Sequence, residues 1–496
     1  MGKFKSLAGD TIVYGGSTIL VRLLNWLLMP YYIRTMDGIQ YGIVTQLYSY
    51  IAILLVILTY GFETSFFRFA KTKNYSSVFT TAIGSIFSTS LLFLWFVVIF
   101  KDSFSAWLSN GIPAKLVVIV ALIVIIDAIS SLIFAKIRYE GKSVRFGLLK
   151  LLNVLILISF NLFFLYWCPQ NYGSNFFRLL DWYAFSDDQA FFVLLSNLFA
   201  SFSILVVILP DVFNCIGKLD FRLLLNMYKY SFPILIVGIT GMINIQIDKI
   251  LIPKLVGGDE GLRQLAIYGA NFKIGVLMAM FTQSFRLAFE PFFFKNHADN
   301  KRPGMYSDIL KFFTLFGLLI FLGVTFFMDF INIVLTEEYE QGNVIIPIVL
   351  VAQLLSGIYF TLSVWYKVTD NTKYGAFMGI VGSIITVSLN FILIPVIGYI
   401  GAALASLICF AVMVGLSIYW GNKHSNIRYN WWPILRYIAL AAVIYVTGIY
   451  ILPLINIYKS DFSILWYDIL LYGVRIGLII VFLGFVYLKE FKKKLI

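Results

Sequence analysis

The stretch GMINIQIDKILIPKL, from Gly241 to Leu255, is apolar enough to lie in a membrane, yet it carries Asp248 and Lys249 side by side. Other long apolar segments carry lone cations, at Arg22, Lys273 and Arg475. A charged side chain at the middle of a bilayer costs about 2.5–3.5 kcal/mol on insertion scales. Each of these residues is therefore expected to have a partner or a function.

The composition indicates a polytopic membrane protein. The 496 residues are 60% hydrophobic and 13% charged, whereas soluble domains are about a quarter charged. The three cysteines, Cys168, Cys215 and Cys409, are too few and too far apart to predict a disulfide framework or a metal site.

The hydropathy pattern predicts an all-α fold. About 20 apolar residues cross the hydrocarbon core as a helix, and the sequence holds fourteen such runs. The runs cover residues 11–33, 41–62, 77–100, 113–135, 147–167, 189–210, 231–253, 265–288, 308–334, 343–366, 374–396, 399–420, 434–456 and 465–487.

The distribution of Lys and Arg predicts the orientation. With the N-terminus inside, 26 of the 38 Lys and Arg residues fall on the inner side and seven on the outer side. Cytoplasmic connections carry such an excess of cations, so both termini are expected in the cytoplasm. The net charge of +13 needs no nucleic-acid partner to explain it. The basic inner surface would also favour anionic lipid headgroups.

An internal repeat relates the first six spans to the next six. The segment YGIVTQLYSYIAILLVILTYGFETSFFRF (41–69) aligns without gaps on YGANFKIGVLMAMFTQSFRLAFEPFFFKN (268–296). Asn161 and Asn390 also correspond, and Pro30 and Pro253 each end the first predicted helix of a copy. The pattern predicts an N-lobe at 1–210, a C-lobe at 211–425, and two further helices with a basic cytoplasmic tail at 426–496. Parallel repeats of this kind are typical of transporters that bind substrate between their lobes.

The deep cations are the main candidates for a binding site. Arg22 lies about 11 residues into the first span, roughly 16 Å deep at 1.5 Å per residue, and Lys273 is also near the midplane. Both are expected to face an aqueous cavity, with buried structural pairing as the alternative. Lys249 and Arg286 are further candidates, although Lys249 is close enough to the outer end to reach the interface. Pyrophosphate is the natural ligand of such a cluster, because Arg offers a planar fork and Lys a point charge.

The acidic residues of the spans have two possible roles, ion coupling or gating on one hand and structural pairing on the other. Asp127 is expected to partner Arg22, and Asp248 to pair with a cation near Lys249. Glu63 and Glu290 correspond in the repeat and fit a gate or a lobe contact at the inner ends. Two further pairs are expected within single helices. They are Arg286 with Glu290 and Asp468 with Arg475.

Motifs for bond-making chemistry are not visible. The sequence has no GxxxxGK[ST] phosphate-binding loop, no His/Cys metal set and no nucleophile elbow. No catalytic residue, metal or cofactor is expected, and the predicted protein is not an enzyme.

Four segments give the sequence a resemblance to a known superfamily. They are YGGSTILVRLLNWLLMPYY (14–32), IDKILIPKLVGGDEGLRQLAIYGANFKI (247–274), FRLAFEPFF (285–293) and LNFILIPVIGYIGAALASL (389–407). Together with fourteen spans and a six-plus-six repeat, they resemble the MOP exporter superfamily. Within it, the chain is similar to Wzx-type flippases of the bacterial inner membrane, which handle O-antigen or related glycans.

The resemblance implies a function. A Wzx-type protein moves undecaprenyl-pyrophosphate-linked oligosaccharide to the outer leaflet by alternating access through a cationic cavity, and Arg22, Lys249 and Lys273 match basic positions in helices 1, 7 and 8. Membrane lipids, a glycan polymerase and other assembly proteins are the implied partners. Two other transport functions stay open, a MATE-type multidrug antiporter and a peptidoglycan-precursor (lipid II) flippase. A membrane glycan polymerase and a non-transporting scaffold are further alternatives. MATE proteins typically place an acid in helix 1, where this chain has Arg22.

Overall fold

A computed structural model describes residues 2–108, 112–171, 189–297, 304–368, 371–424, 429–457 and 464–490. All regular structure in these ranges is helical, which confirms the all-α prediction. The described helices are α1 (Gly2–Thr35), α2 (Gly38–Thr59), α3 (Phe62–Phe69), α4 (Tyr75–Leu108), α5 (Ala114–Tyr139), α6 (Ser143–Leu162), the π-helix η1 (Phe163–Trp167), α7 (Cys168–Gln170), α8 (Gln189–Phe213), α9 (Phe221–Val256), α10 (Gly258–Ile274), α11 (Val276–His297), α12 (Met305–Phe326), α13 (Met328–Val334), α14 (Glu337–Glu340), the 3₁₀-helix η3 (Gln341–Val344), α15 (Ile345–Leu362), α16 (Val364–Val368), α17 (Thr372–Ile397), α18 (Tyr399–His424), α19 (Trp431–Ile457) and α20 (Ile464–Glu490).

Most predicted spans fall on single long helices. Twelve helices of the described chain are long and apolar enough to cross a membrane, or 13 if the pair α10 and α11 counts as one span. The remaining predicted span corresponds to α1, whose hydropathy is lowered by polar residues such as Arg22 and Asn25. The chain is therefore a multi-pass membrane protein, while the number fourteen and the orientation of the termini stay predictions.

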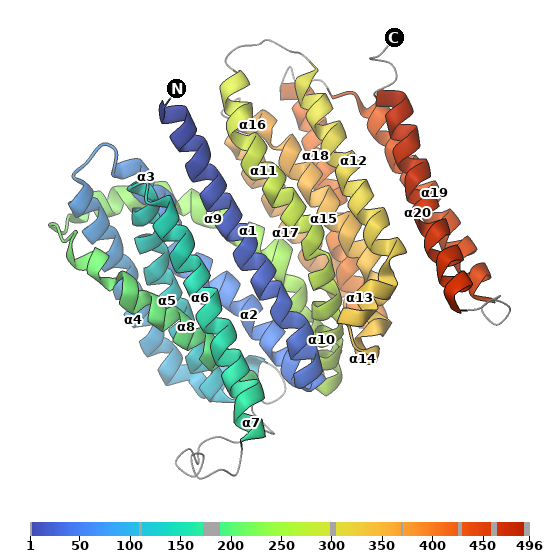
Figure 1. The fold of residues 1–496 in the computed structure, drawn as a ribbon. Helices are drawn as coiled ribbons and strands as arrows, with labels where there is room; N and C mark the ends of the chain where they lie inside the picture. The colour runs from blue at the N-terminus through green and yellow to red at the C-terminus, as the bar shows by residue number, and fades with distance from the viewer. Residues whose placement is uncertain are drawn as a thin grey trace. The chain divides into compact units, whose positions relative to one another are not determined.

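The chain divides into two compact units. Unit 1 comprises residues 1–273 and 376–409, and unit 2 comprises residues 274–375 and 410–496. Figure 1 traces both units, with α1 to α8 in the blue-to-green part of the colour range and α11 to α16 in the lime-to-orange part. The chain crosses from one unit to the other near Lys273, at Gly375 and in the middle of α18. The predicted lobe boundaries stay predictions.

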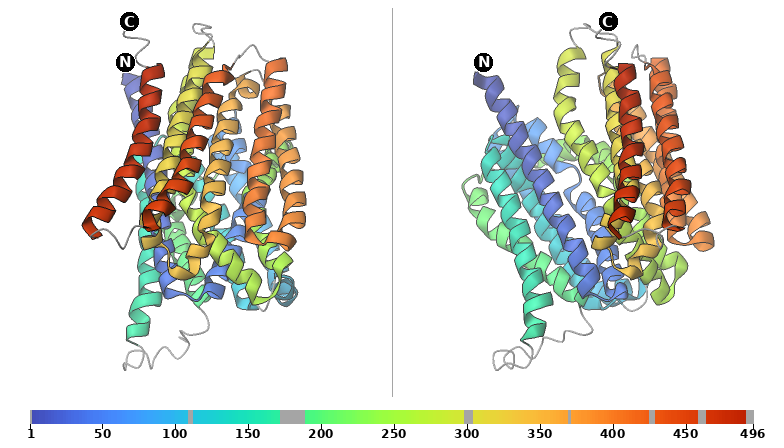
Figure 2. Two further views of the ribbon diagram at one scale, coloured as in Figure 1. Left: turned by 90° about the vertical axis from the view of Figure 1, so that its right-hand side faces the viewer. Right: turned by 45° about the vertical axis from the view of Figure 1, so that its right-hand side comes forward.

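Unit 1 is built on α2 and α5. Helix α5 packs against α4, α8 and α2, and α2 packs in turn against α9. Helix α1 packs on α6, and these two helices run side by side in Figures 1 and 2. These helices bury apolar residues against one another, as in any helical core, while lipid can cover their other faces.

Corresponding residues of the two repeats have similar surroundings in unit 1. Tyr41 and Tyr268 are both fully buried. Asn161 and Asn390 are also fully buried, and each donates its Nδ2 to the carbonyl oxygen four residues earlier, at 2.8 Å. The amide donors are thus satisfied inside their own helices. The predictions that Pro30 and Pro253 end their helices are both wrong, since α1 continues to Thr35 and α9 continues to Val256.

Small residues let the backbones of unit 1 approach closely. A Cβ on Gly42 of α2 would lie 2.2 Å from the carbonyl oxygen of Leu262 in α10. On the same contact, a Cβ on Gly269 would lie 2.9 Å from the side chain of Thr45. Glycine at helix interfaces is a common way for membrane helices to pack, and here the paired glycines come from corresponding positions of the repeat.

Unit 2 is organised around α12, which packs against α15 and α19. Helices α19 and α20 lie side by side, as both views in Figure 2 show. Arg475 of α20 contacts the carboxylate of Asp329 at the start of α13. The expected pairing of Arg475 with Asp468 is therefore wrong, and Asp468 is exposed. Sequence spacing along α20 could not reveal an acid on another helix.

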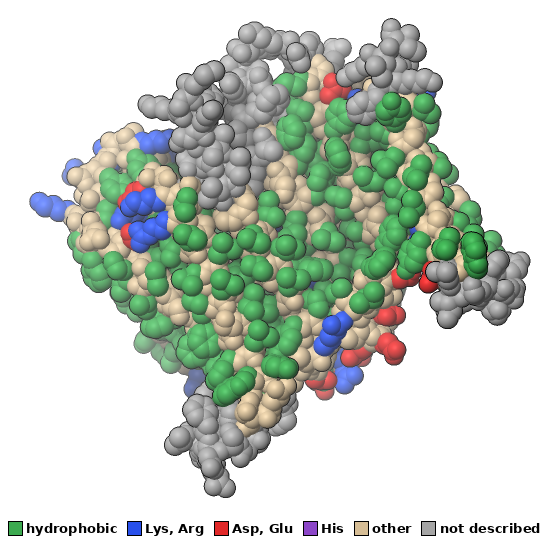
Figure 3. Space-filling model, in the orientation of Figure 1, with side chains coloured by type: hydrophobic (Ala, Val, Ile, Leu, Met, Phe, Trp, Pro, Cys, Tyr) green, Lys and Arg blue, Asp and Glu red, His purple; other side chains and the backbone are tan. Residues whose placement is uncertain are grey.

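The visible surface fits a lipid environment. Figure 3 shows hydrophobic side chains over most of the described surface on this face, with charged side chains mainly toward the helix ends. Exposed apolar residues such as Leu92, Trp95 and Val396 are numerous in both the early and the late helices. In water such a surface would mark aggregation or an interface, so its extent agrees with the membrane spans.

The Gly42 contact gives a stability prediction. In Gly42→Ala, the added methyl group would overlap the Leu262 carbonyl, and overpacking of this kind costs about 1–3 kcal/mol. The apparent Tm of the purified protein in detergent should therefore fall by several degrees. The matched control is Gly241→Ala in α9, where a Cβ would meet no heavy atom within 4 Å. Equal Tm values for the two variants would contradict the proposed close approach of α2 and α10.

Candidate functional site

Three of the predicted cations come from helices that have contacts at the last turn of α10. The backbone oxygen of Lys273 accepts a hydrogen bond from Nε1 of Trp26 in α1, at 2.9 Å. Trp26 follows Arg22 by one helical turn, so Arg22 and Lys273 belong to helices in direct contact. On the other side of the same turn, Nζ of Lys249 in α9 lies 4.1 Å from the ring centroid of Phe272. We call Arg22, Lys249 and Lys273 the cationic cluster.

Lys249 is largely neutralised within this cluster. Its Nζ lies 3.2 Å from Oδ1 of Asp248 and donates to the carbonyl oxygen of Ile245 at 2.7 Å. The hydroxyl of Tyr268 donates to the other carboxylate oxygen of Asp248. Both charged side chains are buried, and the arrangement satisfies them with fixed partners. Lys249 and Asp248 therefore have the contacts of a structural ion pair.

Lys273 of α10 lies near an aromatic ring of α2. Its Nζ lies 5.5 Å from the ring centroid of Tyr41, a cation–π distance. In the part of the chain that the structure describes, no carboxylate lies within ion-pair distance of Lys273. Arg22 is exposed on α1 and makes contacts of its own. With Lys249 balanced by Asp248, Lys273 is left as a cation of the cluster that has no carboxylate at ion-pair distance among the described residues, so it can attract an anion.

A polar cavity of about 350 Å³ lies inside unit 1. Its charged residues are Glu63, Asp127, Arg138 and Lys150, and its polar residues include Asn197. The cavity holds two charges of each sign, so it is balanced overall. It is large enough and polar enough to contain water.

Asp127 has different neighbours from those expected. The structure places it beside Lys150 of α6 and Ser201 of α8, rather than beside Arg22. The Nζ of Lys150 lies 4.1 Å from the ring centroid of Phe134. An acidic side chain inside a membrane helix commonly marks an ion pathway or a pair, and in this cavity Asp127 has a cation of its own protein nearby.

Glu63 is paired at the edge of the same cavity. Nη2 of Arg138 in α5 lies 2.6 Å from Oε2 of Glu63 in α3, and both side chains are partly exposed. The pair joins two helices of unit 1 at their predicted inner ends. Such a partly exposed pair contributes little to stability. Its main effect is to hold the side chains of Glu63 and Arg138 next to each other.

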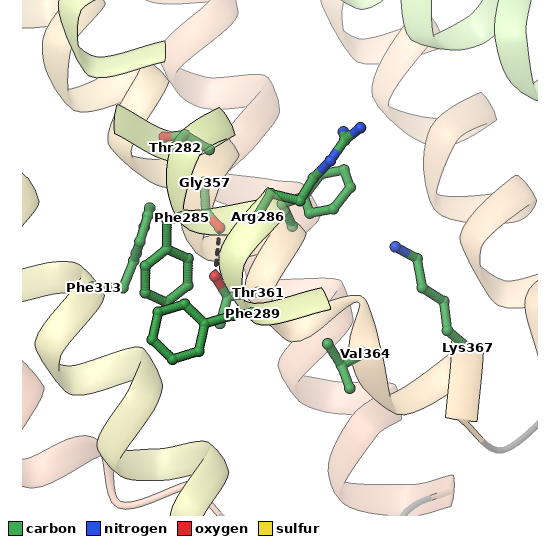
Figure 4. Close-up of a pocket in the computed structure, with 10 residues that line it drawn as sticks. Thr282, Phe285, Arg286, Phe289, Phe313, Gly357, Thr361, Val364 and Lys367 are labelled. Carbon is green, nitrogen blue, oxygen red and sulfur yellow. Dashed lines mark hydrogen bonds between the residues drawn. The ribbon is translucent and has the colours of Figure 1, made fainter. Parts of the chain in front are cut away.

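The fourth predicted cation, Arg286 of α11, belongs to unit 2. It lines a small pocket with Lys367 of α16, and both charges lie 4.5 Å from the ring centroid of Phe360. In Figure 4, Arg286 and Lys367 extend on the side of the pocket away from Phe285 and Phe289. The pocket encloses only about 20 Å³. A ligand would therefore contact its two cations rather than fill it.

Glu290, the predicted neighbour of Arg286, has a side chain outside the described residues. The prediction of a pair within α11 is therefore without a structural test.

Sequence reasoning missed Lys150, Arg138 and Lys367 as site residues. The Lys and Arg count places all three among the 26 cations on the predicted inner side. For Lys150 a signal existed, because it lies three residues inside the predicted span 147–167. For Arg138 and Lys367 only the tertiary contacts distinguish them from other basic residues near helix ends.

Comparisons with known proteins identify solved structures that have a similar fold. No family model matches the sequence, and no curated protein matches it at a significant level. Among solved structures, the lipid II flippase MurJ in an inward closed conformation has a TM-score of 0.73 at 15% identity, covering 96% of this chain and 99% of its own.

Multidrug transporters are also similar. An inward-facing MATE transporter of the MOP superfamily has a TM-score of 0.62 at 12% identity, covering 82% of this chain and 97% of its own. The MATE multidrug transporter DinF-BH, solved as a complex, has a TM-score of 0.62 at 14% identity, with coverages of 85% and 96%. The chain therefore has the fold that MurJ and the MATE transporters of the MOP superfamily share.

Proposed function

We propose that this protein flips undecaprenyl-pyrophosphate-linked oligosaccharide from the cytoplasmic to the outer leaflet of the bacterial inner membrane, for surface polysaccharide biosynthesis. The fold supports transport rather than bond-making chemistry, because the similar solved structures are named as a flippase and multidrug transporters. The substrate class rests on charge, since a phosphate-rich headgroup needs cations at membrane depth.

The observation that carries the proposal is the contact between α1 and α10. The Trp26–Lys273 hydrogen bond brings the turn of Arg22 next to Lys273, inside predicted spans. A cation within a membrane span is costly unless a partner or a bound anion offsets its charge. A pyrophosphate fits, because Arg can bind two of its oxygens at once and Lys can approach as a point charge.

In the proposed transport cycle, the negative charge of the headgroup neutralises the cations of the site. The headgroup enters from the cytoplasm and reduces the repulsion around Arg22 and Lys273, while the prenyl chain stays in lipid. The substrate shifts the conformational equilibrium only by its difference in affinity for the inward-open and outward-open states. Arg286, which lines a pocket of unit 2 with Lys367, stays a further proposed substrate-binding residue.

The acidic residues have narrower proposed roles. Asp248 holds Lys249 in place, and Glu63 holds Arg138. Asp127, beside Lys150 in a cavity that can hold water, is the residue with the environment for ion coupling. The gating role proposed for Glu290 rests only on its correspondence to Glu63 in the sequence repeat.

A lipid II flippase is the second candidate, because its substrate also carries a lipid pyrophosphate. The most extensive likeness described above is to such a protein, which covers 96% of this chain, against 82–85% for the two MATE transporters. A multidrug antiporter would bind cations, which the charges of Arg22 and Lys273 disfavour. A glycan polymerase is weaker still, because no catalytic set is visible in the sequence.

Removing the cationic cluster should stop transport. Arg22→Ala and Lys273→Ala each remove a charged hydrogen-bond donor, so initial flipping rates should fall roughly 10-fold or more. The measurement uses the purified variants in liposomes with a fluorescent undecaprenyl-pyrophosphate glycan, and surface glycan in a strain lacking the native gene. Lys273→Arg should retain part of the rate.

The matched control is Lys71→Ala, which removes an exposed cation from the connection after α3. It should transport normally at the same protein level in the membrane. Full activity of both Arg22→Ala and Lys273→Ala would exclude the anion site. Activity on lipid II but not on glycan-linked carrier would favour the second candidate.

The polar cavity gives an independent prediction. If Asp127 neutralises Lys150, Asp127→Asn should lower the apparent Tm, and adding Lys150→Gln should restore most of the loss. The coupling energy of this double-mutant cycle should be at least about 1 kcal/mol. Additive effects of the two substitutions would show that the residues do not interact. A pair needed only for folding would leave the flipping rate of the double variant unchanged, whereas ion coupling at Asp127 would abolish its response to an ion gradient.

A further inference from the structure

A groove on unit 1 has no role in the proposed transport site. It lies between α2, α4 and α9 and has a volume of about 730 Å³. Ile57, Phe93 and Phe232 are among its apolar residues, and Ile57 and Phe232 are largely exposed. The volume is in the range of ligand pockets, which typically combine apolar walls with a few polar groups.

Two tyrosine hydroxyl groups of the groove are linked through Ser85. The hydroxyls of Tyr60 and Ser85 share a hydrogen bond of 2.8 Å, and Ser85 shares another of 2.7 Å with the hydroxyl of Tyr228. The rings of Tyr60 and Tyr228 stack with centroids 5.3 Å apart. These contacts hold two phenol groups in a groove whose other lining residues are mostly apolar.

The backbone beneath the groove is strained. Tyr60 has φ 34°, the one positive φ of a non-glycine residue in the described chain, and Gly61 follows with φ 75°. The strain separates α2 from α3. At the corresponding positions of the repeat, 287 and 288, helix α11 continues without a break. Strained residues persist where surrounding contacts hold them and often mark functional sites, so the first copy has a feature that the second lacks.

A cation lies at the predicted inner end of the groove. Lys229 of α9 lines it. In the described parts of the chain, no carboxylate lies within ion-pair distance of Lys229. Pro233 has no N–H group, so it leaves the carbonyl oxygen of Lys229 without its helical hydrogen bond. Phosphate and glycerol oxygens are suitable partners for the ammonium and for the phenol hydroxyls.

We propose that this groove binds an anionic phospholipid of the inner leaflet, with its phosphate at Lys229 and an acyl chain along Ile57, Phe93 and Phe232. Charge decides between membrane lipids, because a zwitterionic headgroup would bring its own cation to Lys229. The cytoplasmic leaflet supplies anionic lipids and attracts cations near its surface. A bound chain would also cover apolar surface next to the strained Tyr60–Gly61 break and so stabilise it.

The test measures lipid binding and does not depend on the transported substrate. The full chain is purified in detergent and titrated with phosphatidylglycerol or phosphatidylcholine, and bound lipids are counted by native mass spectrometry. Wild-type protein should retain phosphatidylglycerol in preference to phosphatidylcholine. Lys229→Gln should reduce the retained phosphatidylglycerol at least 3-fold, whereas Lys71→Gln, a control with the same loss of charge on the inner side, should leave it unchanged.

The location is tested with a photoreactive phosphatidylglycerol whose acyl chain carries a diazirine. Labelled peptides should come from the segments around residues 57, 93 and 232, and Phe232→Ser should lower the labelling without loss of folded protein, because Phe232 is 61% exposed. Equal losses in Lys229→Gln and Lys71→Gln, equal retention of the two lipids, or labelling spread over all helices would each overturn the proposal. Flipping measured in the same variants separates this result from the proposed function.

Discussion

The cost of charge in an apolar environment is the constraint on which this structure depends. Each charged side chain within the spans must pair with another group, contact water or bind a ligand. Asp248 and Lys249 meet the first condition together with Tyr268, and Arg475 meets it through Asp329. Asp127 and Lys150 share a polar cavity instead. Charge placement therefore determines which helices must lie next to one another, beyond what hydrophobic packing requires.

Close packing supplies the precision that these charges need. Gly42 and Gly269 let α2 and α10 approach at the backbone, and the same approach positions the last turn of α10 between α1 and α9. A bulkier residue at either glycine would move Lys273 relative to Arg22. The two copies of the repeat thus each contribute a glycine to the contact between α2 and α10. This shared packing requirement is a physical reason why the two copies are still similar here.

The cations divide by their surroundings into two groups. Lys249, Arg138 and Arg145 have fixed carboxylate partners, Arg145 through two hydrogen bonds to Asp211. Lys273 and Lys229 have none among the described residues, and they lie at different places in unit 1. The proposed headgroup site and the proposed phospholipid groove follow from this difference. One would use cations at depth, and the other a cation at the inner interface.

The sequence by itself determined the class, the helical spans and most of the charged candidates, because hydropathy over about 20 residues follows directly from the thickness of the bilayer. It also revealed the repeat through matched residues such as Tyr41 and Tyr268. Only the tertiary structure decided the partners. Asp127 lies beside Lys150 and Arg475 contacts Asp329, because helices far apart in sequence bring these residues together. The groove beside Tyr60 likewise depends on three separate helices and on a backbone conformation that residue identity did not predict.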